Sequence, residues 1–411
     1  MSIGDVYKLN LEKIVSGGDT LGKYKGKPVF VAGGAPEEMV LCRIIEEHNT
    51  WARAELLEII NPSSVRVDSV CSFYGKESCG GCNLAHIDYN EQLKIKAVIL
   101  KDSLLHALQS NVQIPEPEIF PSAPWGYRNR MQFHCLRQQA KGTDGLKIGL
   151  KGRRRNEIIA VPDCPVAVQG IRDALKGDGF PLPVEKDRFN VFSKDDVLLS
   201  EGGKQKGKIK LLDKEIFVDV SLFFQSNCSM LEKLILELRK IAHAVLATHA
   251  AKDLPMADLY CGVGTFAFFL SDLFPKLILA EESKASVSLA RENLKLLNVN
   301  AELFALRDTE WYKSTGRDQK ESFSINNILL HQKEKFGFII ADPPRAGLSS
   351  KLAQIISQEG PPVFAYVSCD AASLARDAKI LVNGGYKLNK LLMFDFYPQT
   401  AHIESLAVFE K

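Results

Sequence analysis

The stretch PPVFAYVSCDAASLARDAKIL, residues 361–381, joins an apolar run to a pattern typical of an amphipathic helix. The run PPVFAYV has the length of one buried strand, and the helical spacing of apolar residues begins just after Cys369. Cys369 therefore lies at the carboxyl edge of an α/β sheet, where such sheets place their chemistry. A cysteine at this place is either a small buried apolar residue or a nucleophile, and its position alone leaves both open.

The rest of the C-terminal half repeats this pattern. A long helical segment starts near residue 222, and strands and helices then alternate to residue 411. Such alternation indicates a parallel sheet covered by helices. We predict a Rossmann-like α/β domain over residues 221–411 that ends in two antiparallel strands. The segments that read as strands with their turns are MADLYCGVGTF, LILAEES, AELFALRD and FGFIIADPPRAGL, and the closing pair lies in YKLNKLLMFDFYPQTAHIESLAVFEK.

The first turn of this domain indicates the kind of ligand. It has Gly262 and Gly264 but no third glycine, and no Lys-Ser/Thr pair follows as in a P-loop. Glu281 ends the second strand, where an acid meets ribose hydroxyls in nucleotide-binding sheets. A nucleoside without a pyrophosphate fits this combination, so we predict S-adenosylmethionine (SAM) as the cofactor.

Four of the nine cysteines have the spacing of a metal site. Cys71, Cys79 and Cys82 form C-x7-C-x2-C, and Cys164 lies in PDCPV. Four thiolates fit either tetrahedral zinc or a [4Fe–4S] cluster. A cysteine followed by proline, with one C-x2-C pair instead of two, favours the cluster. The other cysteines, apart from Cys369, show no ligand spacing and are interpreted as packing residues.

The N-terminal half reads as two further units. Short strands with Gly-rich turns over residues 1–66 predict a small β-barrel of the oligonucleotide-binding type, although a purely structural barrel has the same pattern. Residues 67–220 are interpreted as a central α+β domain with the cysteines and a basic, aromatic sheet. Cations that hold phosphates and rings that stack on bases suit RNA, whereas a solvated charged face is the alternative. The residues we assign to RNA are Tyr127, Arg128, Arg130, Arg153 and Arg154.

The composition and net charge are those of an ordinary globular protein. Hydrophobic residues make up 45% and charged residues 25% of the 411, and the net charge is +2. These values are ordinary for a globular protein and do not by themselves indicate nucleic acid. Neither a signal peptide nor an apolar run of transmembrane length is found, so we expect a cytoplasmic protein whose cysteines are not paired as disulfides.

Taken together, the motifs C-x7-C-G-G-C, FFQSN, DLYCGVGTF, ADPPRAGL, YVSCD and FYPQTAHIES make the whole chain resemble a known family. It resembles the SAM-dependent RNA 5-methyluridine methyltransferases, most closely the branch with an N-terminal TRAM domain and an iron–sulfur cluster that acts on 23S ribosomal RNA. A sister branch modifies a uridine in the T-loop of tRNA.

The resemblance assigns roles to residues. It implies that Cys369 is a nucleophile that adds to C6 of uracil, that Glu404 is the base, and that Asp342 lies between cofactor and uracil. The residues implied for the SAM pocket are Gln225, Tyr260, Gly262, Gly264, Thr265, Glu281, Asp308 and Asp342, and those implied for the cluster are Cys71, Cys79, Cys82 and Cys164. We expect a monomer that binds RNA. The alternatives are the same chemistry on tRNA, an amino-group methyltransferase, a non-catalytic RNA-binding protein with a SAM fold, and an iron–sulfur electron carrier or radical enzyme.

Overall fold

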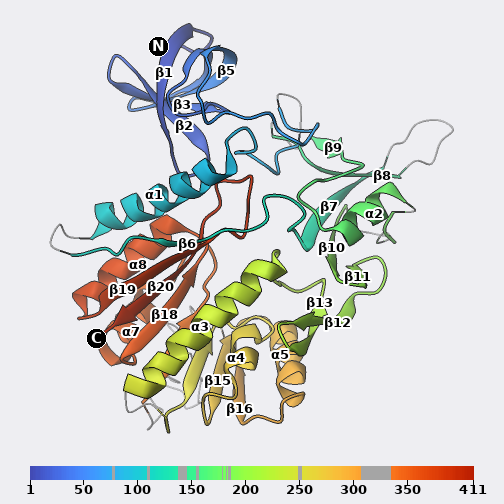
Figure 1. The fold of residues 1–411 in the computed structure, drawn as a ribbon, viewed down its shortest axis with the longest axis vertical. Helices are drawn as coiled ribbons and strands as arrows, with labels where there is room; N and C mark the ends of the chain where they lie inside the picture. Colours follow the sequence, from blue (N-terminus) through green and yellow to red (C-terminus); the bar gives the residue numbers. More distant parts are fainter. Residues whose placement is uncertain are drawn as a thin grey trace, which may run out of the picture.

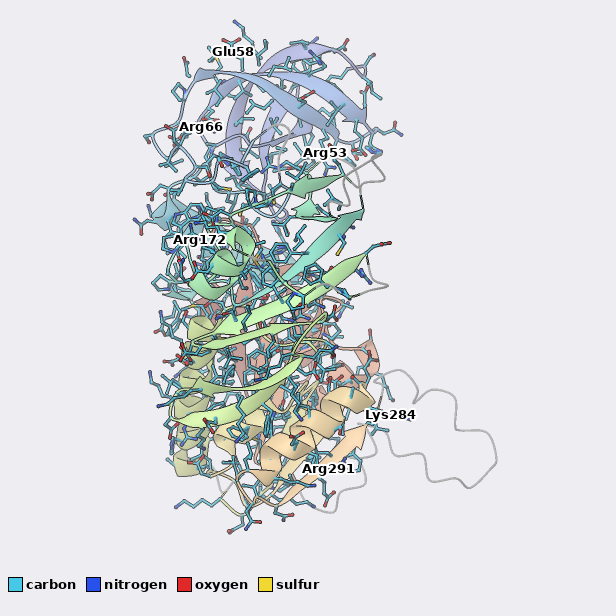
Figure 2. All side chains as sticks on the ribbon, turned by 90° about the vertical axis from the view of Figure 1, so that its right-hand side faces the viewer. Arg53, Glu58, Arg66, Arg172, Lys284 and Arg291 are labelled. Atoms are coloured by element: carbon cyan, nitrogen blue, oxygen red, sulfur yellow. The ribbon has the colours of Figure 1, made fainter. Side chains whose placement is uncertain are left out.

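The computed structural model describes residues 1–75, 79–108, 112–137, 146–153, 157–177, 179–181, 183, 187–248, 252–306 and 335–411. Along the long axis of the molecule, a β-barrel lies at one end, a five-stranded sheet in the middle, and a large α/β layer at the other end (Figures 1 and 2). In the described ranges no helix combines the length and the apolar character needed to cross a membrane.

The N-terminal strands form a closed barrel in the order β1-β2-β3-β5-β4. Side chains alternate between the barrel interior and solvent, and the interior is filled by small and branched residues such as Val29, Val31 and Ala54. A closed barrel in this part of the chain agrees with the small β-barrel predicted from the sequence. The strands are β1 (Val6–Ile14), β2 (Asp19–Tyr24), β3 (Lys27–Ala32), β4 (Met39–Glu47) and β5 (Ala52–Asn61).

The middle sheet is antiparallel, with the order β11-β10-β7-β8-β9. One face carries Phe133, Phe189 and Val191, which pack with helix α2 (Gln169–Lys176) and with the cysteine segment. The turn predicted between the first two strands lies outside the described residues. The strands are β7 (Arg130–Arg137), β8 (Leu146–Lys151), β9 (Ile158–Ala160), β10 (Arg188–Lys194) and β11 (Val197–Ser200).

The C-terminal sheet has eight strands in the order β16-β15-β14-β17-β18-β20-β19-β6. The five strands from β16 to β18 are parallel and nearly continuously apolar, as expected for a sheet covered on both faces. Strand β20 then pairs antiparallel with β18 and β19, and its pairing with β19 is the closing antiparallel pair predicted from the sequence. The strands are β14 (Met256–Leu259), β15 (Leu277–Glu281), β16 (Ala301–Ala305), β17 (Phe338–Ala341), β18 (Val363–Ser368), β19 (Lys387–Phe394), β20 (Glu404–Glu410) and β6 (Glu118–Phe120).

Helices cover both faces of this sheet (Figure 1). One face packs against helices α3 (Cys228–Thr248), α4 (Thr265–Leu270) and α5 (Lys284–Lys295). The other face packs against helices α1 (Tyr89–Ala107), α7 (Ser350–Glu359) and α8 (Ala371–Asn383). With both faces covered, the carboxyl edge of the parallel strands is left for a ligand.

Two segments from the predicted central domain pack on the C-terminal layer. Helix α1 buries Leu100 and Leu104 against that layer, and β6 extends its sheet. The hairpin of β12 (Lys206–Leu211) and β13 (Lys214–Asp219) buries Ile209 and Ile216 in the same core as α3 to α5. We therefore propose that the C-terminal domain begins near the start of β12, before residue 221.

Candidate active site

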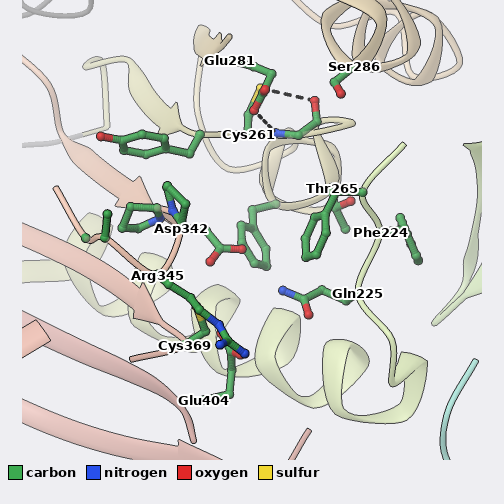
Figure 3. Close-up of a pocket in the computed structure, with 18 of the residues that line it drawn as sticks. Phe224, Gln225, Cys261, Thr265, Glu281, Ser286, Asp342, Arg345, Cys369 and Glu404 are labelled. Atoms are coloured by element: carbon green, nitrogen blue, oxygen red, sulfur yellow. Dashed lines mark hydrogen bonds between the residues drawn. The ribbon is translucent and has the colours of Figure 1, made fainter. Parts of the chain in front are cut away.

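The turn after β14 brings the backbone close to a ligand position. Tyr260, Gly262 and Gly264 have φ values of 60°, 55° and 79°, a left-handed conformation that glycine adopts easily. Glu281 accepts hydrogen bonds from the backbone N–H groups of Gly262 (3.1 Å) and Ser283 (2.9 Å). These bonds fix the Glu281 carboxylate over the turn (Figure 3), where its remaining lone pairs can accept from ribose hydroxyls.

Asp342 and Gln225 face each other across the cavity (Figure 3). Asp342 follows β17, and its backbone N–H donates to Leu259 O at 3.2 Å, which places the residue beside the SAM turn. Gln225 lies just before α3, with its side-chain amide close enough to Asp342 to act on the pKa of that carboxyl. Its Oε1 atom is buried and has no partner among the described residues. A buried orphan acceptor is costly, so it marks a place for a ligand N–H donor.

Cys369 and Glu404 are brought together by the pairing of β18 with β20. The register matches Ser368 with Ser405, so in this antiparallel ladder Cys369 is opposite Glu404. The chain can leave the sheet at Cys369 because Asp370 caps helix α8 by accepting from Ser373 N–H at 2.8 Å. Glu404 is 3% exposed, and its Oε1 atom has no partner among the described residues.

Arg345 supplies positive charge to this group of acids. It follows Asp342 in the DPPR turn, and Figure 3 shows its guanidinium beside Cys369 and Glu404. Its Nη2 atom lies 3.3 Å from His402 Nδ1, within hydrogen-bond distance. The sequence alone places this arginine in the ADPPRAGL motif and assigns it no role.

These residues line one cavity of about 1110 Å³. Its size exceeds the usual range for a single small ligand, which leaves room for a cofactor and a nucleotide. Of the residues predicted for catalysis or SAM, it is lined by Gln225, Tyr260, Gly262, Thr265, Glu281, Asp342, Cys369 and Glu404. Gly264 is not among the lining residues and instead forms the N-cap of α4, where the turn ends. Asp308 lies outside the described residues.

The cavity favours neutral acids. Burial, followed by the charges of Glu404 and Asp342, raises the pKa of Cys369 to about 12, while Arg345 acts to lower it. Burial raises the pKa of Asp342 to about 7, and the Gln225 amide opposes that shift. Burial and then Asp342 raise the pKa of Glu404 well above its ordinary value, against the effect of Arg345. Arg345 is thus the charge that favours both a thiolate at Cys369 and a carboxylate at Glu404.

Residues that were not predicted for the site also form walls of the cavity. Gly80 and Gly81 of the cysteine segment line it, as do Phe223 and Tyr397. Arg128 lies 5.8 Å from the centre of the Tyr397 ring. Because these residues come from segments far apart in the chain, no local pattern could reveal that they meet.

The residues predicted for RNA have mixed environments. Tyr127 is 4% exposed and donates its hydroxyl to Pro398 O at 2.9 Å, so it packs between segments and presents no ring to a base, which corrects the prediction for this residue. Arg128 lines the cavity. Arg130 donates to Val220 O at 3.3 Å, and Arg153 donates to Cys82 O at 2.8 Å. Arg154 lies outside the described residues.

The four predicted ligand cysteines share one region. In the described ranges, no three or more His, Cys, Asp or Glu side chains are grouped in a way that could hold a single metal ion. Burial and then the thiols of Cys164, Cys79 and Cys71 nevertheless raise the pKa of Cys82 to about 12, so the four lie within electrostatic reach. Gly81 N–H points at Cys79 Sγ at 3.4 Å.

Comparisons with known proteins agree with this geometry. Residues 206–411 match the family described as tRNA (uracil-5-)-methyltransferase. An uncharacterized RNA methyltransferase of Treponema denticola is 32% identical over 430 aligned residues, covering 97% of this chain and 98% of that protein. The 23S rRNA (uracil(1939)-C(5))-methyltransferase RlmD of Vibrio campbellii is 27% identical, covering 98% of this chain and 95% of that protein.

A solved structure has the same fold along the whole chain. The crystal structure of Pyrococcus abyssi tRNA (uracil-54, C5)-methyltransferase in complex with S-adenosyl-L-homocysteine superposes with a TM-score of 0.70 at 22% identity. The match covers 98% of this chain and 100% of that chain. The chain therefore belongs to the family of SAM-dependent RNA (uracil-C5-)-methyltransferases.

Proposed function

We propose that this protein methylates C5 of a specific uridine in 23S ribosomal RNA through a covalent bond between Cys369 and uracil C6. The observation that carries the proposal is the meeting of Cys369, Glu404 and Asp342 in the cavity that also holds the Glu281 turn. An amino-group methyltransferase would use the acid of a D-P-P turn but would need neither a thiol nor a second buried carboxyl. Both are present here.

Uracil explains why a thiol is needed. C5 of uracil is too weak a nucleophile to take a methyl group unaided. When the Cys369 thiolate adds to C6, the electron pair of the C5–C6 bond becomes enolate-like, and C5 can form a bond to the methyl carbon as the sulfonium–methyl bond breaks. Glu404 then removes the C5 proton as a general base, and the S–C6 bond breaks to restore the double bond and release the thiolate.

Three neighbours support this sequence. The Gln225 amide and Asp342 can hydrogen-bond the polar edge of the uracil ring, because both face the space between the SAM turn and Cys369 (Figure 3). Arg345 lies where its charge can stabilise the enolate and the departing thiolate. The position of Cys369 inside the cavity, where it is only half-exposed, requires that the target uridine leave its base stack, as in other enzymes that modify bases.

SAM fits the other part of the cavity. Glu281 is held by two backbone N–H groups and keeps lone pairs free for ribose hydroxyls. Phe223, which is 61% exposed at the cavity, offers an apolar surface for a flat ring. When bound, SAM supplies the electrophilic methyl group, and the uncharged turn glycines allow its close approach.

The choice of ribosomal RNA rests on the names of the relatives. Several are 23S rRNA uracil methyltransferases that align over nearly the full chain at 26–27% identity. The test is mass mapping of 5-methyluridine in rRNA and tRNA from cells with and without the gene. We expect one 5-methyluridine of 23S rRNA to disappear with the gene. Loss of 5-methyluridine from tRNA alone would contradict the choice of substrate while leaving the chemistry intact.

We further propose that Cys71, Cys79, Cys82 and Cys164 hold a [4Fe–4S] cluster. A cluster is larger than one ion, so its four thiolates need a wider spacing than a single metal site provides. Two observations support this: the Cys82 thiol lies within electrostatic reach of the other three, and Gly81 N–H donates to Cys79 Sγ at 3.4 Å. When bound, the cluster would fix this segment, which lines the cavity, and no step of the methyl transfer passes through it.

Iron and acid-labile sulfide analysis of anaerobically purified protein tests the cluster. We expect about four of each per chain for the native sequence and a large loss for Cys82→Ala, because that thiol is central to the group. The control is Cys42→Ala, whose buried thiol lies in the barrel. Protein that contains zinc in place of iron, or equal iron in both variants, would contradict the assignment.

A further inference from the structure

The two ends of the stretch Tyr366–Asp377 are joined by a buried hydrogen bond. Tyr366 of β18 donates its hydroxyl to Asp377 Oδ2 at 2.8 Å, and Asp377 projects from helix α8. Both side chains are fully buried. The bond therefore spans the turn that contains Cys369 and ties the strand before it to the helix after it.

The same carboxylate holds the DPPR turn. Asp377 Oδ2 also accepts from Leu348 N–H at 2.8 Å, while Oδ1 accepts from Arg376 Nε at 2.8 Å. The Arg376 guanidinium in turn donates to Ala346 O at 2.8 Å and to Leu348 O at 2.9 Å. Helix α8 thus holds the backbone at 346–348 in two ways: Asp377 accepts from the Leu348 N–H group, and Arg376 donates to carbonyl oxygens of that segment.

Gly347 makes this close approach possible. Its φ is 75°, and a Cβ there would lie 2.5 Å from Asp377 Oδ2 and 2.7 Å from a guanidinium nitrogen of Arg376. Only a residue without a side chain lets the turn sit against the charged pair. The conformation of the turn and the position of the pair therefore depend on each other.

We propose that Asp377, with Tyr366 and Arg376, is a positioning residue that holds the DPPR turn so that Arg345 stays beside Cys369. Burying a carboxylate in an apolar core is costly, and apolar side chains at this place would stabilise the turn equally well. What the Asp377 carboxylate provides in addition is a set of directional hydrogen bonds that fix the position of one short turn. Arg345 directly precedes the segment 346–348 that the Asp377–Arg376 pair holds, so a loosened turn would displace its guanidinium. This inference rests on the proposed function of Cys369.

The thiol of Cys369 can report the position of Arg345 directly. The charged groups that face it are Glu404 from β20, Tyr397 from the preceding loop, and Asp342 and Arg345 from the DPPR turn. Of these, only Arg345 favours the thiolate. The rate at which iodoacetamide alkylates Cys369 depends on the thiolate fraction, so it falls if the guanidinium moves away.

The test compares Asp377→Asn with Tyr386→Phe as the matched control. Asn keeps the shape of Asp377 but cannot accept from Tyr366, Leu348 and Arg376 together. Tyr386→Phe removes another buried hydroxyl bond, to Pro361 O, that lies away from the cavity in the same layer. The alkylation rate of Cys369 is followed by peptide mass spectrometry from about pH 6 to pH 10, and methyl transfer and SAM affinity are measured beside it.

We expect Asp377→Asn to alkylate about fivefold to tenfold more slowly at mildly alkaline pH, with its profile moved to higher pH, and to transfer methyl groups about tenfold more slowly. Its SAM affinity and the behaviour of Tyr386→Phe should stay near the native values. Gly347→Ala, which pushes the turn without removing a polar group, should act like Asp377→Asn.

An unchanged alkylation profile and transfer rate in a folded Asp377→Asn would overturn the proposal and leave the network a purely stabilising role. If Asp377→Asn does not fold, Tyr366→Phe removes one donor only, and the same readouts decide. If the native protein alkylates as expected but transfers no methyl group to any RNA, the proposed function fails, whereas the positioning of Arg345 is still decided by the alkylation arm.

Discussion

At the scale of single residues, one arginine offsets the effect of two acids on the pKa of a thiol. Cys369 lies against Glu404 and Asp342, and both raise its pKa. A thiol with a pKa of about 12 is almost entirely protonated at neutral pH. The positive charge of Arg345, together with the sulfonium of a bound cofactor, works in the opposite direction.

Arg345→Ala should slow adduct formation and move the pH dependence. Because Arg345 lowers the pKa of Cys369, its removal raises that pKa, so the rate at any neutral pH falls and the rising limb of the profile moves to higher pH. We expect a loss of about tenfold to a hundredfold in single-turnover methyl transfer, with Arg345→Lys in between. Equal pH profiles for all three proteins would show that this charge does not act on the thiol.

Glu404→Gln should trap the RNA on the protein. The amide cannot take the C5 proton, so the methylated adduct at Cys369 has no route to release its thiolate. Denaturing gel electrophoresis with labelled RNA should show a retained band that is absent in Cys369→Ala/Glu404→Gln. Free RNA alone after denaturation would indicate that another group is the base.

Strand ends could be predicted from sequence because their signals are local. The apolar runs before Asp342 and Cys369, and the glycines before helix α4, are each contained in a dozen residues. The pairing of Cys369 with Glu404 depends on the register of β18 with β20, which no local pattern encodes. Only the family resemblance indicated Glu404. The burial of Tyr127 was missed for the same reason, since its partner Pro398 is distant in sequence.

At the scale of elements, β14 carries a buried acid whose charge is unfavourable. Asp258 is fully buried below the SAM turn and accepts from Ala267 N–H at 3.0 Å. Burial raises its pKa to about 7, and only the Ala267 bond lowers it. Through this bond Asp258 supports the first turn of helix α4, which begins at Thr265.

Asp258→Asn should therefore change the pH dependence of stability. The unfolded chain loses this proton near pH 4 and the folded chain near pH 7, so the native protein loses stability as the pH rises between these values. The variant lacks this loss, which amounts to about 4 kcal/mol at most. The melting temperature of the variant minus that of the native protein should rise from pH 5 to pH 8. Exposed Asp213→Asn is the control, and a constant difference would contradict the shift.

The extent of each helix and strand was easier to predict than the element against which it packs. Apolar strands and the amphipathic helix before residue 108 follow from hydrophobic periodicity. That α1 and β6 would pack on the C-terminal layer, and that the β12–β13 hairpin would share its core, could not be predicted, because each segment is equally compatible with a separate central domain. The structure shows that the hairpin belongs with the C-terminal layer, because the side chain of Asn293 in α5 accepts from the Phe217 N–H and donates to the Phe217 C=O.

At the scale of the whole molecule, Asn83 links the barrel, the cysteine segment and the active-site loop. Its side chain donates to Gly17 O in a barrel turn at 2.8 Å and accepts from Ala401 N–H at 2.8 Å. Its backbone N–H donates to Gln399 O at 3.1 Å. Gln399 has a φ of 67°, a strained conformation that these contacts maintain. The arrangement couples the cysteine segment to the loop before Glu404.

Asn83→Ala should loosen this junction without unfolding the C-terminal sheet. Loss of two side-chain hydrogen bonds costs about 2 kcal/mol locally. Hydrogen exchange should quicken at residues 16–19 and 399–402, with β14 and β17 unchanged, and methyl transfer should slow several-fold. Asn389→Ala, which loses an exposed bond to Glu410, is the control. Unchanged exchange at both segments would show that the barrel and the loop are held independently of Asn83.

The covalent bond between Cys369 and the target uracil can be tested directly with a fluorinated substrate. Fluorine at C5 cannot be removed as a proton, so a 5-fluorouridine transcript of 23S rRNA should halt the reaction after methyl transfer. Incubation with SAM, denaturation, nuclease digestion and peptide mass spectrometry should give a methylated fluorouridine nucleotide attached to Cys369. Cys369→Ala should bind SAM normally but give neither this adduct nor 5-methyluridine in unmodified RNA. An adduct on another residue, or normal methylation by Cys369→Ala, would contradict the account.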